Sequence, residues 1–164
     1  MLTALSFESA PGNTTGGTVT FLVGSSAGNG VTAASLDQEY EFEGTEKPKM
    51  QAAGQHERYV YVRRLVLPLS GLIKADTAAN WASTRQSFAA KLLPNTGTQT
   101  ERRHGTLKAT FTGQSQVYAE VVCRELNLPM DVNEGGPFVS EYSLRFVANY
   151  GYWRLVSTNA VLKI

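Results

Sequence analysis

The chain is poor in cysteine, in histidine and in net charge, and each shortage excludes a class of protein. A single cysteine, Cys123, cannot form a disulfide within the chain or a multi-cysteine metal cluster. Fifteen Lys and Arg residues against fourteen Asp and Glu give a formal charge of +1, which argues against a protein that mainly grips nucleic acid or an anionic membrane. The two histidines, His56 and His104, lie in polar segments without metal-ligand spacing, so we expect no metal and no cofactor.

Long apolar runs are also missing. No stretch approaches the roughly 20 apolar residues of a membrane helix, and residues 1–8 lack the basic and apolar regions of a signal peptide. We therefore expect a soluble protein with no membrane anchor. With 164 residues, 42% of them hydrophobic, the chain is expected to form one domain with a substantial core, spanning residues 1–164.

Short alternating segments separated by glycine-rich turns predict a mainly antiparallel β protein. The predicted strands are residues 18–23, 36–43, 58–69, 106–112, 115–128 and 138–148. The polar segment 44–57 shows no usable period and predicts a long loop, and residues 154–164 predict a C-terminal edge strand or arm. With one helix, the fold class is α+β: a split β-barrel or sandwich with a flanking helix.

The helix is predicted at residues 76–93, from Asp76 to Leu93. Asp76 is a suitable N-cap, and several alanines favour helix. Trp81, Phe88 and Leu92 fall on one helical stripe, which we expect to pack on the sheet.

The predicted strand 58–69 is apolar on both faces, so it requires cover on both sides. That cover comes either from the chain's own helix or from a neighbouring subunit. One face carries Tyr59, Tyr61, Leu65, Leu67 and Leu69. The other face predicts an intersubunit strand formed by Val60, Val62, Arg64 and Val66.

An acidic row follows one face of the predicted strand 36–43: Asp37, Glu39, Glu41 and Glu43. Carboxylates spaced ~6.5–7 Å along a strand approach the separation in inverting glycosidases, but nothing in the row supplies the apolar pocket that raises one pKa. The row is either a solvated face or a surface turned towards a partner. Two pairs of consecutive arginines, at 63–64 and 102–103, could form ion pairs with the row from a neighbouring subunit.

Candidate catalytic residues are few. Ser26 lies in Gly-Ser-Ser-Ala-Gly, a nucleophile-elbow pattern, but the helix and parallel sheet that the elbow requires are not predicted. Cys123 is in phase with apolar strand residues and is interpreted as a small buried hydrophobe. We therefore do not expect an enzyme.

The second half of the chain resembles the N-terminal domain of bacteriophage distal tail proteins. The strand segment 65–71 ends in Leu-Pro-Leu-Ser-Gly, a helix with Arg85 and Phe88 follows, and the hairpin 105–122 comes next. The last strand, 142–148, leads into Asn-Tyr-Gly-Tyr-Trp at 149–153, where Gly151 occupies a position at which the family typically has proline. The resemblance covers roughly residues 59–153.

The resemblance implies a split β-barrel, six copies of which form a ring that joins the tail tube to the tail tip or baseplate around a central DNA channel. It implies a virion protein made in the host cytoplasm, with tail-tube and tail-tip proteins as partners and DNA passing without specific binding. The acidic row would then line the lumen. The chain ends about ten residues after Trp153, so the family's C-terminal carbohydrate-binding domain is not expected.

Two alternatives remain open at this point. Within the same class, the chain would be a tail-tube or tube-terminator subunit. From another class, it would be a small β-sandwich carbohydrate-binding module with a groove lined by Tyr152 and Trp153. Aromatic residues after a strand also commonly cap a barrel core, which is the competing interpretation of Trp153.

Overall fold

The structure is a computed structural model that describes residues 1–9, 17–24, 28–48, 55–92, 104–129, 138–148 and 150–162. Of residues 43–48, 55–61, 104 and 162 it describes the backbone only.

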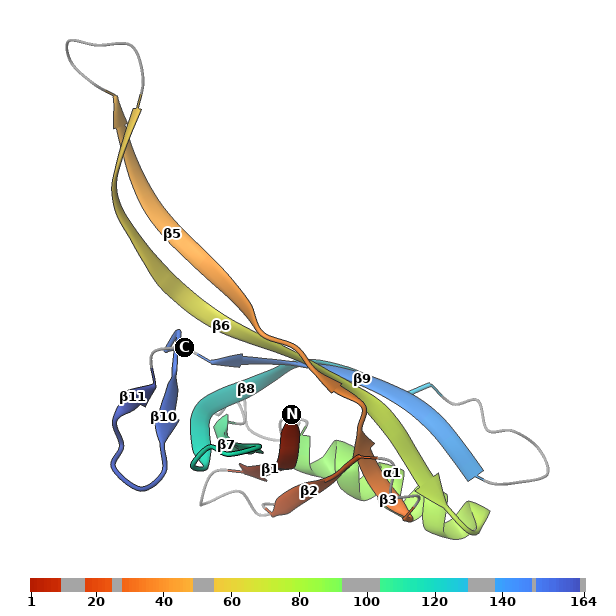
Figure 1. Cartoon of the computed structure of the whole chain (residues 1–164). Helices are drawn as coiled ribbons and strands as arrows, with labels where there is room; N and C mark the ends of the chain where they lie inside the picture. The colour runs from red at the N-terminus through yellow and green to blue at the C-terminus, as the bar shows by residue number, and fades with distance from the viewer. Residues whose placement is uncertain are drawn as a thin grey trace.

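One helix and eleven strands occupy the described residues (Figure 1). The elements are β1 (Leu2–Ser9), β2 (Thr18–Val23), β3 (Gly30–Ala33), β4 (Ser35–Leu36), β5 (Glu39–Pro48), β6 (Gln55–Ala75), α1 (Ala78–Leu92), β7 (His104–Phe111), β8 (Val117–Asn127), β9 (Phe138–Ala148), β10 (Trp153–Leu155) and β11 (Val161–Leu162).

Seven of the described strands close into a barrel. Around the barrel the order is β1, β2, β3, β6, β9, β8 and β7, and β7 pairs again with β1. Every one of these pairs is antiparallel except β2 with β3, which is parallel. The predicted mainly antiparallel α+β class is confirmed. Closure leaves this part of the sheet without an open edge.

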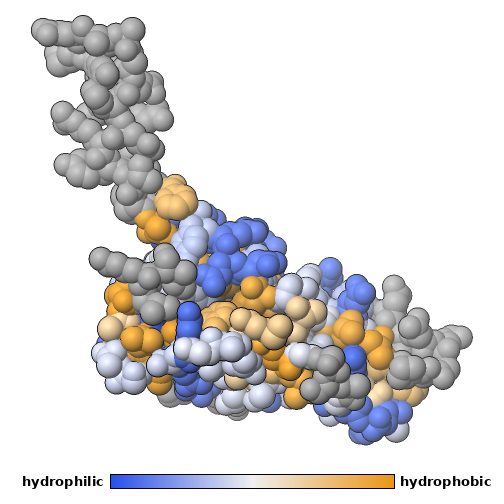
Figure 2. Space-filling model, in the orientation of Figure 1, coloured by the Kyte–Doolittle hydropathy of each residue, from blue (hydrophilic) through white to orange (hydrophobic). Residues whose placement is uncertain are grey.

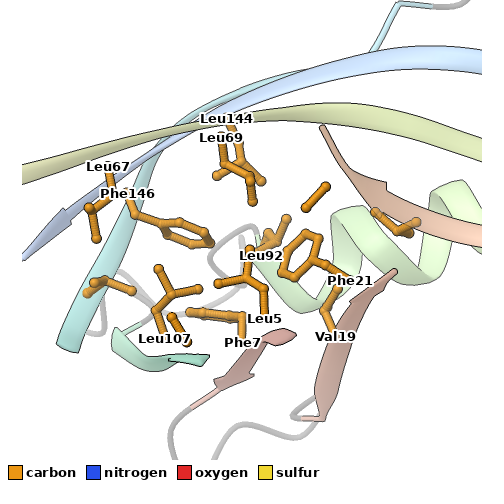
Figure 3. Packing of buried hydrophobic residues seen from close by; sticks show 14 of the residues in the cluster. Leu5, Phe7, Val19, Phe21, Leu67, Leu69, Leu92, Leu107, Leu144 and Phe146 are labelled. Carbon is orange, nitrogen blue, oxygen red and sulfur yellow. The ribbon is translucent and has the colours of Figure 1, made fainter. Parts of the chain in front are cut away.

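The barrel interior is a hydrophobic core built from every strand of the ring (Figure 3). The rings of Phe7 and Phe146 stack near its centre with centroids 5.2 Å apart. Leu67, Leu69 and Leu107 are all at most 1% exposed. The odd-numbered leucines of β6 therefore point inwards, as the alternation predicts.

Helix α1 packs against β2, β6, β8 and β9 (Figure 1). Its buried residues are Trp81, Phe88 and Leu92, and the Trp81 indole N–H donates to Ser140 Oγ at 3.1 Å. The predicted N-cap is wrong by one residue: the Thr77 hydroxyl, not Asp76, accepts the Asn80 N–H at 3.2 Å. The Thr77 hydroxyl thus lies against an N–H of the first turn, while the Asp76 carboxylate accepts a hydrogen bond from Asn29.

The predicted long loop at 44–57 is wrong at both of its ends. Residues 44–48 belong to β5 and residues 55–57 to β6, and Glu46 pairs with Glu57 in the backbone register. Hydrophobic alternation could not reveal these residues, because the segment 44–57 carries none and only the backbone register with the neighbouring strand shows them.

Four other strands, β1, β3, β10 and β11, differ from the sequence-based expectation. Strands β1 and β3 lie outside the predicted strands. The C-terminal edge strand is instead a hairpin of β10 and β11, in which β10 pairs with β8. Each of β3, β10 and β11 is four residues or fewer, too short to show a period.

Candidate assembly surface

A two-stranded arm leaves the barrel (Figure 1). We define the arm as β5, residues 39–48, together with residues 55–64 of β6. Strand β6 pairs with β9 only through residues 65–75, so among the described residues the 55–64 stretch has β5 as its single strand partner. At about 3.3 Å per residue, these ten residues extend roughly 33 Å beyond the part of β6 that pairs with β9.

A β-bulge marks the base of the arm. Glu41 pairs with Arg64, but the next residue, Phe42, pairs with Val62, so Arg63 is the extra residue on β6. Side chains that oppose each other in an antiparallel pair lie on the same face. Val62 therefore shares a face with Phe42, whereas Arg64 lies on the opposite face with Glu41.

The predicted intersubunit strand does not form one face. The bulge at Arg63 places Arg64 and Val66 on one side of the sheet and Val62 on the other. Sequence alternation could not show this, because a single inserted residue exchanges the two faces of every residue beyond it. For Val60 the structure describes the backbone alone, paired with Gly44.

Val66 is also unavailable to a neighbouring copy. It is 1% exposed and aligned across the strands with Val147 and, through it, Val122, which are both buried. The prediction that this position needs a second subunit for cover is therefore wrong: the chain itself covers Val66. Exposed apolar surface lies instead at the base of the arm, where Phe42 is 64% exposed.

The acidic row is partly neutralised within the chain. Glu39 Oε2 lies 3.2 Å from a guanidinium nitrogen of Arg145, and Glu41 Oε2 lies 4.0 Å from one of Arg64. Asp37 is exposed, and its backbone N–H donates to the Pro68 carbonyl at 3.0 Å. The side chain of Glu43 and the arginine pair 102–103 lie outside the description. The predicted arginine partner 64 thus belongs to the same chain as the row.

The segment after β9 closes against the base of the arm. Trp153 is fully buried, and its indole N–H donates to Gln38 Oε1 at 3.4 Å. Gly151 lies so close to Val62 that a Cβ added to it would stand 2.3 Å from Val62 Cγ1. Trp153 therefore belongs to the core and not to an open groove, which removes one wall of the predicted sugar site.

The described residues bring together no group of three or more His, Cys, Asp or Glu side chains that would hold a metal ion. Cys123 is half-buried, and burial raises the pKa of its thiol to about 12, so it is a protonated thiol at neutral pH. Ser26 and the side chains of His56 and His104 lie outside the description. None of the described helical segments is long and apolar enough to cross a membrane.

Neither a protein-family model nor a curated protein matches the chain. Among solved structures, a chain from one titled as the tail of an empty GTA particle with C6 symmetry is similar, with a TM-score of 0.45 and 11% identity. The match covers 93% of this chain and 95% of the other.

Proposed function

We propose that the chain is a structural subunit of the tail of a long-tailed phage or tail-like particle, and that its copies form a ring at the distal end of the tail tube. The arm is the observation that carries the proposal. The likeness of residues 59–153 to the distal tail family supplies the expectation of six copies, of tube and tip partners, and of a place in the virion.

The arm requires cover that the described chain does not provide. An isolated two-stranded ribbon is marginally stable in water. Its outer edges carry backbone N–H and C=O groups without strand partners among the described residues. A neighbouring copy that packs on the arm would supply both contacts and pairing. Repeating that contact head to tail closes a ring.

The acidic row suits the lumen of such a ring. Glu39 and Glu41 each face an arginine, so the acidic row and its partners carry no excess of positive charge. DNA phosphates bind proteins by releasing counterions to lysine and arginine. A charge-balanced or acidic lumen surface would therefore let DNA pass without binding it. The proposal includes no enzymatic step and no cofactor.

The test is the solution mass and shape of the purified full chain. We expect light scattering over a range of concentrations to give six times the 17.8 kDa of one chain, and negative-stain images to show rings that stop at one or two layers. Long tubes would identify a tail-tube subunit instead. A strict monomer at every concentration would overturn ring formation.

A shortened-arm variant provides the matched control. Replacing residues 45–59 by Asn-Gly joins the paired residues Gly44 and Val60 by a two-residue hairpin turn that favours antiparallel pairing, and it leaves every strand of the barrel in place. We expect this variant to keep the circular dichroism and thermal unfolding of a folded barrel but to remain monomeric. Rings formed by the shortened chain would show that the arm is not the assembly element.

A further inference from the structure

The inner face of the barrel continues onto the base of the arm as exposed aromatic surface. Tyr40 pairs with the buried Leu65 and therefore starts on the core side of the sheet. Phe42 is two residues farther along β5, and its ring centroid lies 6.4 Å from that of Tyr40. Val62 is opposite Phe42 across the strands and on the same face.

The segment before β10 extends this surface from the other side. Gly151 lies against Val62, which brings its two tyrosine neighbours to the arm. The rings of Tyr150 and Tyr152 have centroids 6.0 Å apart. The Arg154 guanidinium carbon lies 5.4 Å from the first ring and 5.5 Å from the second, within cation–π range.

We name these residues the aromatic strip: Tyr40, Phe42, Val62, Tyr150, Tyr152 and Arg154. The strip crosses from the arm to the C-terminal hairpin, and Figure 2 shows hydrophobic residues where the arm leaves the barrel. The three exposed aromatic side chains among the described residues all lie in it: Phe42 is 64% exposed, Tyr150 52% and Tyr40 36%.

The strip is large enough to matter for association. At roughly 200 Å² for each aromatic side chain, those exposed fractions leave on the order of 300 Å² of aromatic surface. A standard interface takes about 800 Å² from each partner. Val161, 46% exposed and paired with Arg154, extends the strip further. Tyr, Phe and Arg are also the residues that concentrate at interface centres.

We propose that the aromatic strip is the surface by which one copy of this chain binds the next copy in the ring. This inference rests on the proposed function and names the surface that carries it. The strip is continuous with the arm, so a neighbour that covers the arm also reaches the strip. Its one ionic group is Arg154, a cation, and pairing the strip with itself would oppose like charges. The contact is therefore head to tail, with a different surface of the next copy.

The test compares assembly of Phe42→Thr/Tyr150→Ser with two matched variants, Phe42→Tyr and Tyr150→Phe, that keep the aromatic rings. Threonine retains strand propensity in β5. We expect the polar double variant to raise the dissociation constant of the ring about 100-fold or more by analytical ultracentrifugation, and the two aromatic variants to assemble like the wild type. Circular dichroism and the thermal midpoint of the dissociated chain report that each variant is folded.

The outcomes separate this inference from the proposed function. Wild-type rings together with unimpaired rings of the folded double variant would overturn the aromatic strip and leave ring formation standing. A wild-type chain that stays monomeric, even if it binds oligosaccharides, would overturn both. If the double variant unfolds, the single variant Phe42→Thr decides, because its 64% exposed side chain contributes little to the core.

A photo-crosslink identifies what covers the strip. With a benzophenone amino acid at position 42 of the full chain, we expect a crosslinked dimer band at ring-forming concentrations. Peptide mapping should place the crosslink on another copy, outside its own aromatic strip. A crosslink to residue 42 or 150 of the other copy would instead show a two-fold contact and overturn the head-to-tail assignment.

Discussion

Gly71 of β6 lies against the backbone of β3 so closely that no side chain fits. A Cβ at this position would stand 1.8 Å from the Thr32 carbonyl oxygen and 2.8 Å from the Tyr142 hydroxyl. That hydroxyl donates to the same carbonyl at 2.7 Å, and it is buried. Both neighbours are therefore held in place, and neither can move aside without losing the hydrogen bond.

We expect Gly71→Ala to reduce the free energy of unfolding by about 3 kcal/mol or more, because the methyl group overlaps backbone rather than a flexible side chain. Urea unfolding of the full chain measures the loss. Gly28→Ala is the matched control: its nearest neighbour is Leu22 Cδ1 at 3.4 Å, an ordinary contact, and its effect should stay within about 0.5 kcal/mol. Equal losses in the two variants would contradict the close approach.

Cys123 offers a test of burial by chemistry. The thiolate is the reactive form, and an unperturbed cysteine has a pKa near 8.5. Because burial raises the pKa of Cys123 to about 12, the native thiolate population at pH 8 should be about a thousandfold lower than in the unfolded chain. The raised pKa also makes the free energy of unfolding depend on pH. The stability is fully present below the pKa of the unfolded thiol and is lost as the pH rises towards 12.

The measurement is the rate at which an aromatic disulfide reagent modifies the thiol at pH 8, with and without denaturant. We expect native protein to react about a thousandfold more slowly, and the native rate to keep rising with pH above 9. Equal rates in the two states would place the thiol in water.

At the scale of single elements, the start of α1 distinguishes two candidate caps. The Thr77 hydroxyl accepts the Asn80 N–H, and its carbonyl accepts the Trp81 N–H at 2.9 Å. We expect Thr77→Ala to cost about 1 kcal/mol, and Asp76→Ala, at an exposed neighbour without that role, to cost less than about 0.5 kcal/mol. Thermal unfolding of both variants measures the two losses of stability. A larger loss for Asp76→Ala would identify Asp76 as the cap.

Strands and helices that bury one apolar face could be predicted from the sequence. Strands that are recognised only by their backbone pairing could not. Strand β9 was predicted with the bounds that it has, because Tyr142, Leu144 and Phe146 alternate with polar residues. Helix α1 was predicted because its stripe repeats at 3.6 residues. The arm residues 44–48 carry no such alternation in the sequence, and only the backbone register reveals them.

The same distinction explains the assembly surface. A pattern of alternate residues placed Val60, Val62, Arg64 and Val66 on one face, and the bulge at Arg63 divides them. The partners of the acidic row were predicted as residue types, but Arg145 lies 106 positions from Glu39 and only the fold brings them together. Tyr150 and Phe42 are similarly far apart in the sequence, and the contact of Gly151 with Val62 brings them to the same surface.

For the whole molecule, closure of the barrel and projection of the arm have complementary consequences. The seven barrel strands satisfy one another, so this part of the described chain offers no open sheet edge. The outer edges of the arm have no strand partner among the described residues, and the aromatic strip lies at its base. We therefore expect the barrel to fold before assembly, and the proposed association between copies depends on the arm and the strip.

The proposed lumen makes a prediction about threading. In Glu39→Lys/Glu41→Lys/Glu43→Lys, three carboxylates per copy become cations, and the proposed channel wall becomes a phosphate-binding surface whose affinity falls steeply with salt. We expect assembled rings of this variant to bind linear duplex DNA in fluorescence anisotropy at low salt, with wild-type rings binding weakly. The matched Gln variants remove the same carboxylates without adding cations and should behave nearly as the wild type. The ion pairs lost are exposed and worth less than about 1 kcal/mol each, so ring formation should survive.

Closed circular DNA decides the location of the acidic row, because a preformed ring can admit only DNA with a free end. If circles bind the Lys variant as well as linear DNA does, the acidic row faces the outside of the ring.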